Sequence, residues 1–457
     1  MKLFNTATQK LETVPQDHGL TLYTCGPTVY NAPTIGNWRT YIVDDLLVRA
    51  LRANNLKVTR ALNYTDVGHL TSDADTGEDK LQQQAKLEHK KSDQIAAATI
   101  AIFETGYRAL NLIKPDHVLR ATALVPDMII FIQQLEAKGF VYQTSDGVYF
   151  DTSKFATYGQ LARLNLAGSK EGARVEKNPE KKNSSDFALW KFSQPNSHRD
   201  MEWDSPWGKG FPGWHIECST MATKLFGHTI DIHTGGIDNL TTHHQNELAQ
   251  TEALTGQPFV RIWLHIEHLL VEGKRMGKSE GNGLTLTDLT AKGFDPLDLR
   301  YLVLLTHYRQ KQNFTWEALQ AARVARLRMI EKANHTNDDP ADKDFIDKLT
   351  EIVSEDLDYP QAIAELHLYI KEAKPGLAAT IRRADELLFG VINQSKRPKA
   401  ESTIPEAVLA LNKQRDQARA DGMYEEADRL RQQIKEAGFE VIDQAQGSII
   451  KQTDAQV

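Results

Sequence analysis

Two cysteines, one histidine and one glutamate have side chains of the kind that hold transition-metal ions in proteins. His243 and Glu247 stand one helical turn apart in a segment with helical periodicity, so both can reach one ion, while His244 points about a quarter turn away. With the thiols of Cys25 and Cys218 they form a donor set that suits zinc. Such a pair is more often a surface contact, and two distant cysteines are often buried, inert thiols. The spacing allows a zinc site only if the fold brings both cysteines to this helix.

The elements near the N-terminus predict where Cys25 lies. Residues 20–25 read as a strand, residues 38–53 as a helix and residues 56–64 as a second strand. A strand–helix–strand unit favours a right-handed crossover within a parallel sheet, and such sheets bind ligands at the carboxyl ends of their strands. Because Cys25 and Thr65 both stand at such ends, we expect a ligand-binding cavity there.

The predicted sheet is interrupted before it is complete. Between residues 120 and 200 a helix is followed by a strand-like run and a long polar tract, which is typical of an insertion. We expect the parallel sheet to resume near Trp214 and to continue with a strand over residues 229–236. From residue 295 onward helical periodicity dominates, and a polar linker, a helical hairpin and two short strands close the chain.

The composition sets limits on the class of protein. The 457 residues are 40% hydrophobic and 25% charged, which is enough for several buried cores, and only 2 cysteines occur, which argues against a disulfide framework. No apolar run reaches the roughly 20 residues of a membrane span, so we expect a soluble, cytoplasmic protein. The net charge of −7 does not favour a nucleic-acid partner, and the local basic clusters could equally be solvated helix faces.

Six longer motifs follow one another along the chain. They are CGPTVY at residues 25–30, DFALWK at 186–191, WDSPWGKGFPGWHIECS at 203–219, DIHTGGIDN at 231–239, HHQNE at 243–247 and GKRMGKSEGN at 273–282. In type and order these motifs resemble the signatures of the cysteinyl-tRNA synthetases, and the similarity extends through the C-terminal helices. The resemblance implies a monomeric class I enzyme that activates L-cysteine with ATP and Mg²⁺ and transfers it to the 3′-terminal ribose of tRNA(Cys).

The resemblance also implies a fold class and a role for each part of the chain. We expect an α/β fold, with a Rossmann-like parallel-sheet catalytic domain that carries an insertion, followed by a mostly α-helical C-terminal half. The parts are a first catalytic segment 1–119, a connective insertion 120–200, a second catalytic segment 201–256, a stem-contact region 257–315, a helical bundle 316–395 and an anticodon-binding-like domain 402–457.

For the metal, the resemblance implies one zinc ion per chain, held by Cys25, Cys218, His243 and Glu247 and joined by the thiolate of the substrate. The chemistry is reasonable, because cysteine and serine differ by one atom and a pocket that fits shape alone discriminates by only about 1–3 kcal/mol. Zinc binds a soft thiolate far better than a neutral hydroxyl. Selection by bond formation would make an editing domain unnecessary.

The resemblance places four residues against the bound cysteine: Gly26, Thr65, Trp214 and His233. Without the motifs, Trp214 would read as a packed core aromatic, and His233 as a hydrogen-bonded histidine at the end of a strand.

The first nucleotide signature departs from the family pattern. Class I synthetases carry His-Ile-Gly-His at the start of the first helix, and the matching residues here are Thr34, Ile35, Gly36 and Asn37. Gly36 lets the nucleotide approach the backbone, and the helix start offers free N–H groups to phosphate. Asn37 keeps a hydrogen-bond donor. Thr34 can donate through its hydroxyl but never carries charge.

The second nucleotide signature, Lys-Met-Ser-Lys-Ser, is present as RMGKS at residues 275–279 and keeps its second lysine. By analogy, the ammonium group of Lys278 stabilises charge that develops on the α-phosphate. The resemblance thus assigns catalysis to Lys278, Thr34 and Asn37. For binding ATP it adds Gly36 and, by position in matching motifs, Thr28 and Asp238.

Two other functions stay open on the sequence alone. The same cysteine-activating core could pass its product to a small amine, as mycothiol-pathway ligases do, although those lack the full C-terminal end found here. A catalytically weakened paralogue that binds nucleotide or RNA would account for Thr34. The sequence identifies neither the residues that read the anticodon nor the proton acceptor of the transfer step.

Overall fold

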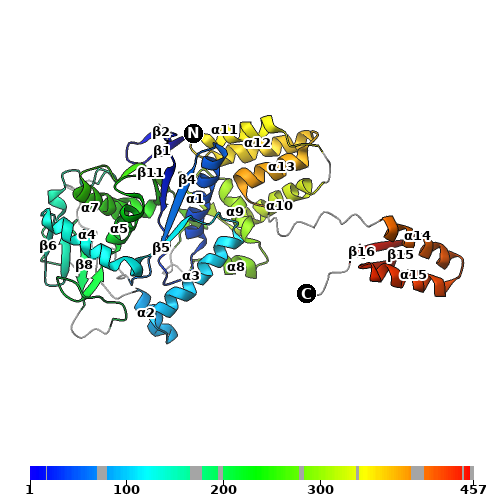
Figure 1. Cartoon of the computed structure of the whole chain (residues 1–457). Helices are drawn as coiled ribbons and strands as arrows, with labels where there is room; N and C mark the ends of the chain where they lie inside the picture. Colours follow the sequence, from blue (N-terminus) through cyan, green and yellow to red (C-terminus); the bar gives the residue numbers. More distant parts are fainter. Residues whose placement is uncertain are drawn as a thin grey trace. The chain divides into compact units, whose positions relative to one another are not determined.

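The computed structural model describes residues 1–16, 18–68, 80–164, 178–193, 199–276, 282–335, 339–392, 406–444 and 447–452. Its internal contacts divide the chain into two units, Met1–Ile392 and Asn393–Val457 (Figure 1). None of the helices within the described ranges is both long and apolar enough to cross a membrane.

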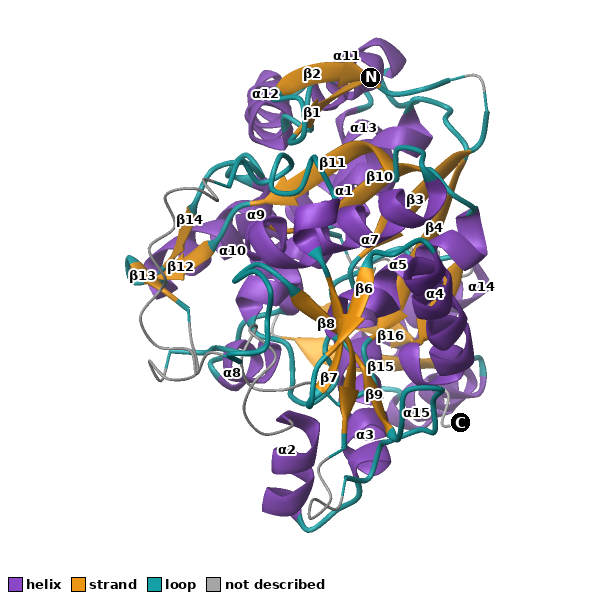
Figure 2. Ribbon diagram, turned by 90° about the vertical axis from the view of Figure 1, so that its left-hand side faces the viewer, coloured by secondary structure: helices purple, strands orange, loops and turns teal. Residues whose placement is uncertain are grey.

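A five-stranded parallel sheet lies at the centre of the first unit, in the strand order β11-β10-β3-β4-β5. Its strands are β3 (Leu20–Thr24), β4 (Val58–Tyr64), β5 (His117–Arg120), β10 (Ile230–Gly236) and β11 (Val260–Ile266). Successive side chains of a strand point to opposite faces. Accordingly, Leu22 belongs to one hydrophobic core and the adjacent Tyr23 to the other. Helices pack against both faces (Figure 2), which explains why β3, β4, β10 and β11 are mostly buried, whereas the edge strand β5 is mostly exposed.

The predicted strand–helix–strand unit is confirmed as β3, α1 (Ile35–Ala53) and β4. The later strand β10 pairs with the other edge of β3, so the strand order reverses there. Ligands of open α/β sheets bind at the carboxyl end of such a reversal point. Cys25, directly after β3, stands at this position.

The predicted insertion contributes three strands to a four-stranded antiparallel sheet in the order β6-β7-β8-β9, whose last strand lies beyond the predicted end at residue 200. It follows α4 (Val125–Ala137), and its strands are β6 (Val141–Gln143), β7 (Gly147–Phe150), β8 (Phe187–Phe192) and β9 (Gly210–Pro212). The prediction that the parallel sheet resumes near Trp214 is wrong, because Trp214 begins helix α5 (Trp214–Phe226) and the next parallel strand is β10. A short apolar run such as the one around Trp214 fits a strand or a buried helix equally well by periodicity.

The remaining elements complete the two units. The first unit also contains β1 (Lys2–Asn5), β2 (Lys10–Thr13), α2 (Lys80–Glu88), α3 (Ser92–Ala109), η1 (Ala121–Leu124), η2 (Thr152–Lys154), α6 (Ile237–Asn239), η3 (Leu240–His244), α7 (Gln245–Thr255), β12 (Leu269–Val271), β13 (Lys274–Arg275), α8 (Leu286–Ala291), α9 (Pro296–Leu304), β14 (Gln312–Phe314), α10 (Trp316–Ala333), α11 (Lys343–Ser354), α12 (Tyr359–Glu372), α13 (Leu377–Ala384) and η5 (Asp385–Phe389). The second unit contains the predicted helical hairpin, α14 (Glu406–Ala420) and α15 (Tyr424–Glu436), and the strands β15 (Phe439–Gln444) and β16 (Gly447–Gln452). The α/β fold with a mostly helical C-terminal half is therefore confirmed.

A buried ion-pair cluster ties α1 to the C-terminal helices of the first unit. Asp45 on α1 is fully buried and accepts hydrogen bonds from Arg300 on α9 at 2.5 Å and from Arg49 at 2.8 Å. The Arg300 guanidinium also donates to the carbonyl oxygen of Phe389 in η5. Burial alone would raise the pKa of Asp45, but Arg300 and Arg49 outweigh it and lower this pKa to about 2.

We expect Asp45→Asn to lower the free energy of unfolding by about 3–5 kcal/mol at neutral pH, because it leaves two buried guanidinium groups without their anion. A carboxyl group with a lowered folded-state pKa stabilises the fold above its unfolded-state pKa, and the stabilisation is lost as pH falls through the folded-state pKa. The deficit of the variant should therefore shrink between the usual pKa of 3.8 and about 2. Urea unfolding across this pH range measures it.

The matched control is Asp347→Asn, which breaks the exposed pair of Lys343 and Asp347. An exposed pair contributes about 0.5 kcal/mol or less, so this variant should unfold like the unmodified protein. An Asp45→Asn variant as stable as this control at neutral pH would contradict a stabilising role for the cluster.

Candidate metal centre and nucleotide cavity

A cavity of about 420 Å³ opens where β3 and β4 end. Eleven of the predicted site residues line it: Cys25, Gly26, Thr28, Thr34, Gly36, Asn37, Thr65, Trp214, Cys218, Asp238 and His243. Glu247 and His233 are fully buried and do not line it. Lys278 lies outside the described residues, so its role stays a prediction. The structure thus brings to one place side chains from nearly the whole length of the Rossmann-like part.

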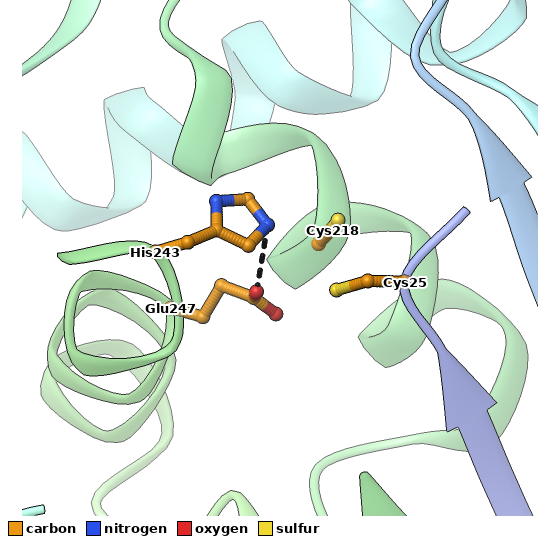
Figure 3. A group of neighbouring side chains, drawn as sticks. All are labelled: Cys25, Cys218, His243 and Glu247. Atoms are coloured by element: carbon orange, nitrogen blue, oxygen red, sulfur yellow. Dashed lines mark ion pairs between the residues drawn. The ribbon is translucent and has the colours of Figure 1, made fainter. Parts of the chain in front are cut away.

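The four predicted metal ligands meet at one side of this cavity. One donor atom from each of Cys25, Cys218, His243 and Glu247 lies within 4.8 Å of the other three (Figure 3). Cys25 follows β3, Cys218 lies on α5, His243 is in η3 and Glu247 is on α7. Bonds of about 2.0–2.3 Å to a tetrahedral zinc place its ligands roughly 3–4 Å apart, so the set fits such an ion after small adjustments.

A π-helical turn, η3, presents the histidine of this set. It precedes α7 without a break, and such turns are frequent at functional sites. His243 and Glu247 share one face, as the sequence predicts, and form an ion pair with 2.9 Å between His243 Nε2 and Glu247 Oε1. Trp214 stacks on the His243 ring with 4.3 Å between the ring centres. The indole therefore forms a wall of the cavity against the metal ligand.

The carboxyl group of Glu247 is held between two imidazoles. Its second oxygen, Oε2, lies 3.0 Å from Nε2 of His233. Burial alone would raise the pKa of Glu247, but His243 and His233 outweigh it and lower this pKa to about 2. Burial lowers the pKa of His243, whereas Glu247 and Cys218 raise it, with a net value of about 10. Glu247 is therefore ionised at neutral pH, which is the form that binds metal.

The two thiols of the set share a hydrogen bond, and this contact separates their acidities. The Cys25 thiol stabilises the thiolate of Cys218 and lowers the pKa of Cys218 to about 7, despite its burial. The same hydrogen bond, with burial, raises the pKa of Cys25 well above its usual value. Cys218 is therefore the more acidic of the two thiols. A metal ion would displace the remaining protons, because cysteine binds metal as the thiolate.

Three further histidines surround the set, and sequence reasoning did not select them as site residues. Nδ1 of His215 lies 2.9 Å from Nδ1 of His243. Nε2 of His244 lies 3.3 Å from the Cys25 sulfur, and its Nδ1 lies 2.8 Å from Nε2 of His265. Such partners orient metal-binding residues and affect metal affinity. The only sequence signal for His244 is its place beside His243 in HHQNE.

The departures from the first nucleotide signature form the start of α1. The Thr34 hydroxyl accepts from the backbone N–H of Asn37 at 3.4 Å, and Asn37 Oδ1 accepts from the backbone N–H of Thr34 at 3.0 Å. This reciprocal cap fixes the helix start without either histidine. The oxygen of Asn37 is thereby occupied, which leaves its NH₂ group as the donor for a ligand.

Residues on both sides of Lys278 in the sequence lie beside this helix start. Ile35 donates its N–H to the carbonyl oxygen of Leu284 at 2.8 Å, and a side chain added at Gly36 would stand 3.6 Å from the Met276 sulfur. Arg275 binds Asp238 with 2.6 Å between Nη2 and Oδ1. The two nucleotide signatures, far apart in sequence, therefore meet at one wall of the cavity.

Comparisons with known proteins agree with this geometry. A family model described as "tRNA synthetases class I (C) catalytic domain" matches residues 11–324. A cysteine–tRNA ligase from Burkholderia lata is 44% identical over 93% of this chain and 91% of the relative, and one from Borrelia turicatae is 37% identical over 99% of both. The chain belongs to the cysteine–tRNA ligase family of class I aminoacyl-tRNA synthetases.

A solved structure of another class I synthetase shares the fold. A methionyl-tRNA synthetase from Mycobacterium tuberculosis, solved with methionyl-adenylate, aligns with a TM-score of 0.54 over 81% of this chain and 89% of that chain, at 15% identity. At that identity the likeness shows the fold alone. The cysteine–tRNA ligase relatives, in contrast, match along nearly the full length, including the C-terminal unit.

Proposed function

We propose that this chain joins L-cysteine to tRNA(Cys) in two steps, of which the first consumes ATP. Family membership supports the reaction class, and the relatives named cysteine–tRNA ligase extend over the whole chain. Cysteine is proposed as the amino acid because a buried set of two thiols, one imidazole and one carboxylate lies beside the cavity. The proposal includes a monomeric enzyme that acts in the cytoplasm.

The proposed metal is one zinc ion per chain, held by Cys25, Cys218, His243 and Glu247. Two sulfur donors, one nitrogen donor and one carboxylate are a set that zinc accepts and magnesium or calcium does not favour. When bound, zinc would supply a soft Lewis acid that prefers a thiolate to a neutral hydroxyl. This preference would separate cysteine from serine beyond the roughly 1–3 kcal/mol that shape allows.

Residues around the metal set are proposed to hold the amino acid. Thr65 and Trp214 line the cavity next to Cys25 and Cys218. Gly26 allows close packing there, since a Cβ at this position would stand 1.6 Å from the carbonyl oxygen of Asn63. His233, which the resemblance places against the substrate, lies behind the cavity and is hydrogen-bonded to Glu247. We therefore assign His233 to orienting the carboxylate.

The activation step needs alignment more than a base, because the cysteine carboxylate is already a nucleophile. We propose that ATP, with Mg²⁺, binds at the N-terminus of α1, where Gly36 and Asn37 offer backbone and side-chain donors. Thr28 and Asp238 are proposed nucleotide contacts on the cavity wall. Lys278 is proposed to stabilise charge on the α-phosphate.

For the transfer step, the 3′-terminal ribose of tRNA(Cys) is the proposed acceptor. The second unit, with its helical hairpin and two strands, is the proposed anticodon-binding module at residues 402–457. A ligase that uses a small amine would not need this module.

The decisive experiment combines cysteine-dependent ATP–pyrophosphate exchange with transfer of labelled cysteine to acceptors. We expect exchange with cysteine and acid-precipitable label on tRNA(Cys), but no product with an amino sugar. Exchange followed by transfer only to the amino sugar would assign a small-amine ligase. No exchange above background in zinc-loaded protein would assign a non-catalytic paralogue.

Removal of one metal ligand should remove both metal and activity. We expect the purified protein to contain one equivalent of zinc, and Cys218→Ser to lose it and to reduce cysteine-dependent exchange by at least about 100-fold. Elemental analysis and the exchange rate measure the two effects. The matched control is Lys224→Ala, an exposed position on the same helix α5, which should keep metal and activity. An active but metal-free protein would contradict the proposal.

Restoring the first signature histidine should change rate without changing selectivity. Thr34 caps α1, at the nucleotide wall, whereas the amino acid is selected at the metal set. We expect Thr34→His to alter kcat of the exchange reaction while the ratio of kcat/KM for cysteine to that for serine stays within about 2-fold. A large change in this ratio would show that the two parts of the cavity do not act separately.

A further inference from the structure

Three long cationic side chains line the cavity within the described ranges: Lys80, Lys191 and Arg275. Two of them are already neutralised by carboxylates. Lys191 Nζ lies 2.6 Å from Asp146 Oδ2, and Arg275 Nη2 lies 2.6 Å from Asp238 Oδ1. These two cations are therefore less available to an incoming anion.

Lys80 differs from both. It is the first residue of α2, and its ammonium nitrogen lies 5.7 Å from the centre of the Tyr30 ring. No acidic side chain of the described residues forms an ion pair with it. A cation–π contact attracts the ammonium group without cancelling its charge. Tyr30 belongs to the loop that leads into Thr34. Lys80 therefore lines the same cavity as the proposed nucleotide site.

We propose that Lys80 binds a phosphate group of ATP. The proposal rests on the proposed function for the location of the nucleotide. The triphosphate brings several negative charges, and the N-terminus of α1 supplies only about half of one positive charge. Thr34 supplies none, although it stands where the family signature has a histidine that can carry charge. Among the described cavity residues, Lys80 is the lysine or arginine whose charge is not already cancelled.

A lysine is suited to this role because its ammonium group is a compact charge on a flexible stem. It can stay at the Tyr30 ring in the free protein and move to a phosphate oxygen when the nucleotide enters. The phosphates at the 3′ end of tRNA could use the same chemistry. The two phosphate sources can be told apart by the exchange reaction, because this reaction needs ATP but proceeds without tRNA.

The test compares Lys80→Ala and the longer, uncharged Lys80→Met with Lys86→Ala. Lys86 lies on the same helix α2 and is exposed, so its variant is a matched control. We expect both Lys80 variants to raise KM for ATP in cysteine-dependent exchange by about 10- to 100-fold, which is the loss of one charged contact. KM for cysteine should change less than about 2-fold. Lys80→Arg should recover most of the loss, and Lys86→Ala should show none.

Direct ATP binding, measured by calorimetry without amino acid, separates this inference from the proposed function. It reports on Lys80 even if the unmodified protein shows no cysteine-dependent exchange. Folded Lys80 variants that bind ATP as tightly as the unmodified protein would overturn the inference. So would an equal rise in KM for cysteine and ATP, which indicates a structural role. Unchanged exchange with slowed transfer to tRNA would assign Lys80 to the acceptor end and would also overturn it.

Discussion

The parallel pairing of β3 with β10 is the constraint on which the site depends. Cys25 directly follows β3, and its backbone N–H reaches the carbonyl oxygen of Thr234 in β10 at 3.3 Å. The helix that carries Cys218 leads into β10, and the turn and helix that carry His243 and Glu247 leave it. One strand pair therefore joins sulfur donors that are almost two hundred residues apart. A shift of one residue in its register would turn every side chain of the strand to the opposite face.

Burial of so many ionisable groups is costly unless their charges compensate one another. Here the carboxylate of Glu247 lies between two imidazoles, and the hydrogen bond from the Cys25 thiol lowers the pKa of Cys218. The same logic holds away from the site, where Asp45 is placed between two guanidinium groups. The metal set is thus preorganised by the protein's own electrostatics, and helix α4 packs against both α5 and α7, which carry two of the ligands. The start of α1, where we propose that the nucleotide binds, lines the same cavity as Cys25, Cys218 and His243.

Local signals in the sequence were sufficient for much of this fold. Helical periodicity predicted α1 and the helical character of the chain after residue 295, and the strand ends at Cys25 and Thr65 predicted the cavity. The failure at Trp214 has a physical cause, since its short apolar run is compatible with a strand and with a buried helix. Contacts between elements that are distant in the sequence could not be predicted from local patterns. His244 in η3 contacts His265 in β11. Arg300 on α9 donates a hydrogen bond to Asp45 on α1. No local pattern encodes such contacts.

The central claim is that a metal ion held by these four residues recognises the sulfur of the substrate. X-ray absorption at the zinc K-edge counts the sulfur neighbours of the metal directly. The account predicts two sulfur neighbours in the zinc-loaded protein, a third when cysteine is added, and no change when serine is added. A zinc environment that stays the same with cysteine, or that gains a ligand equally with serine, would contradict it.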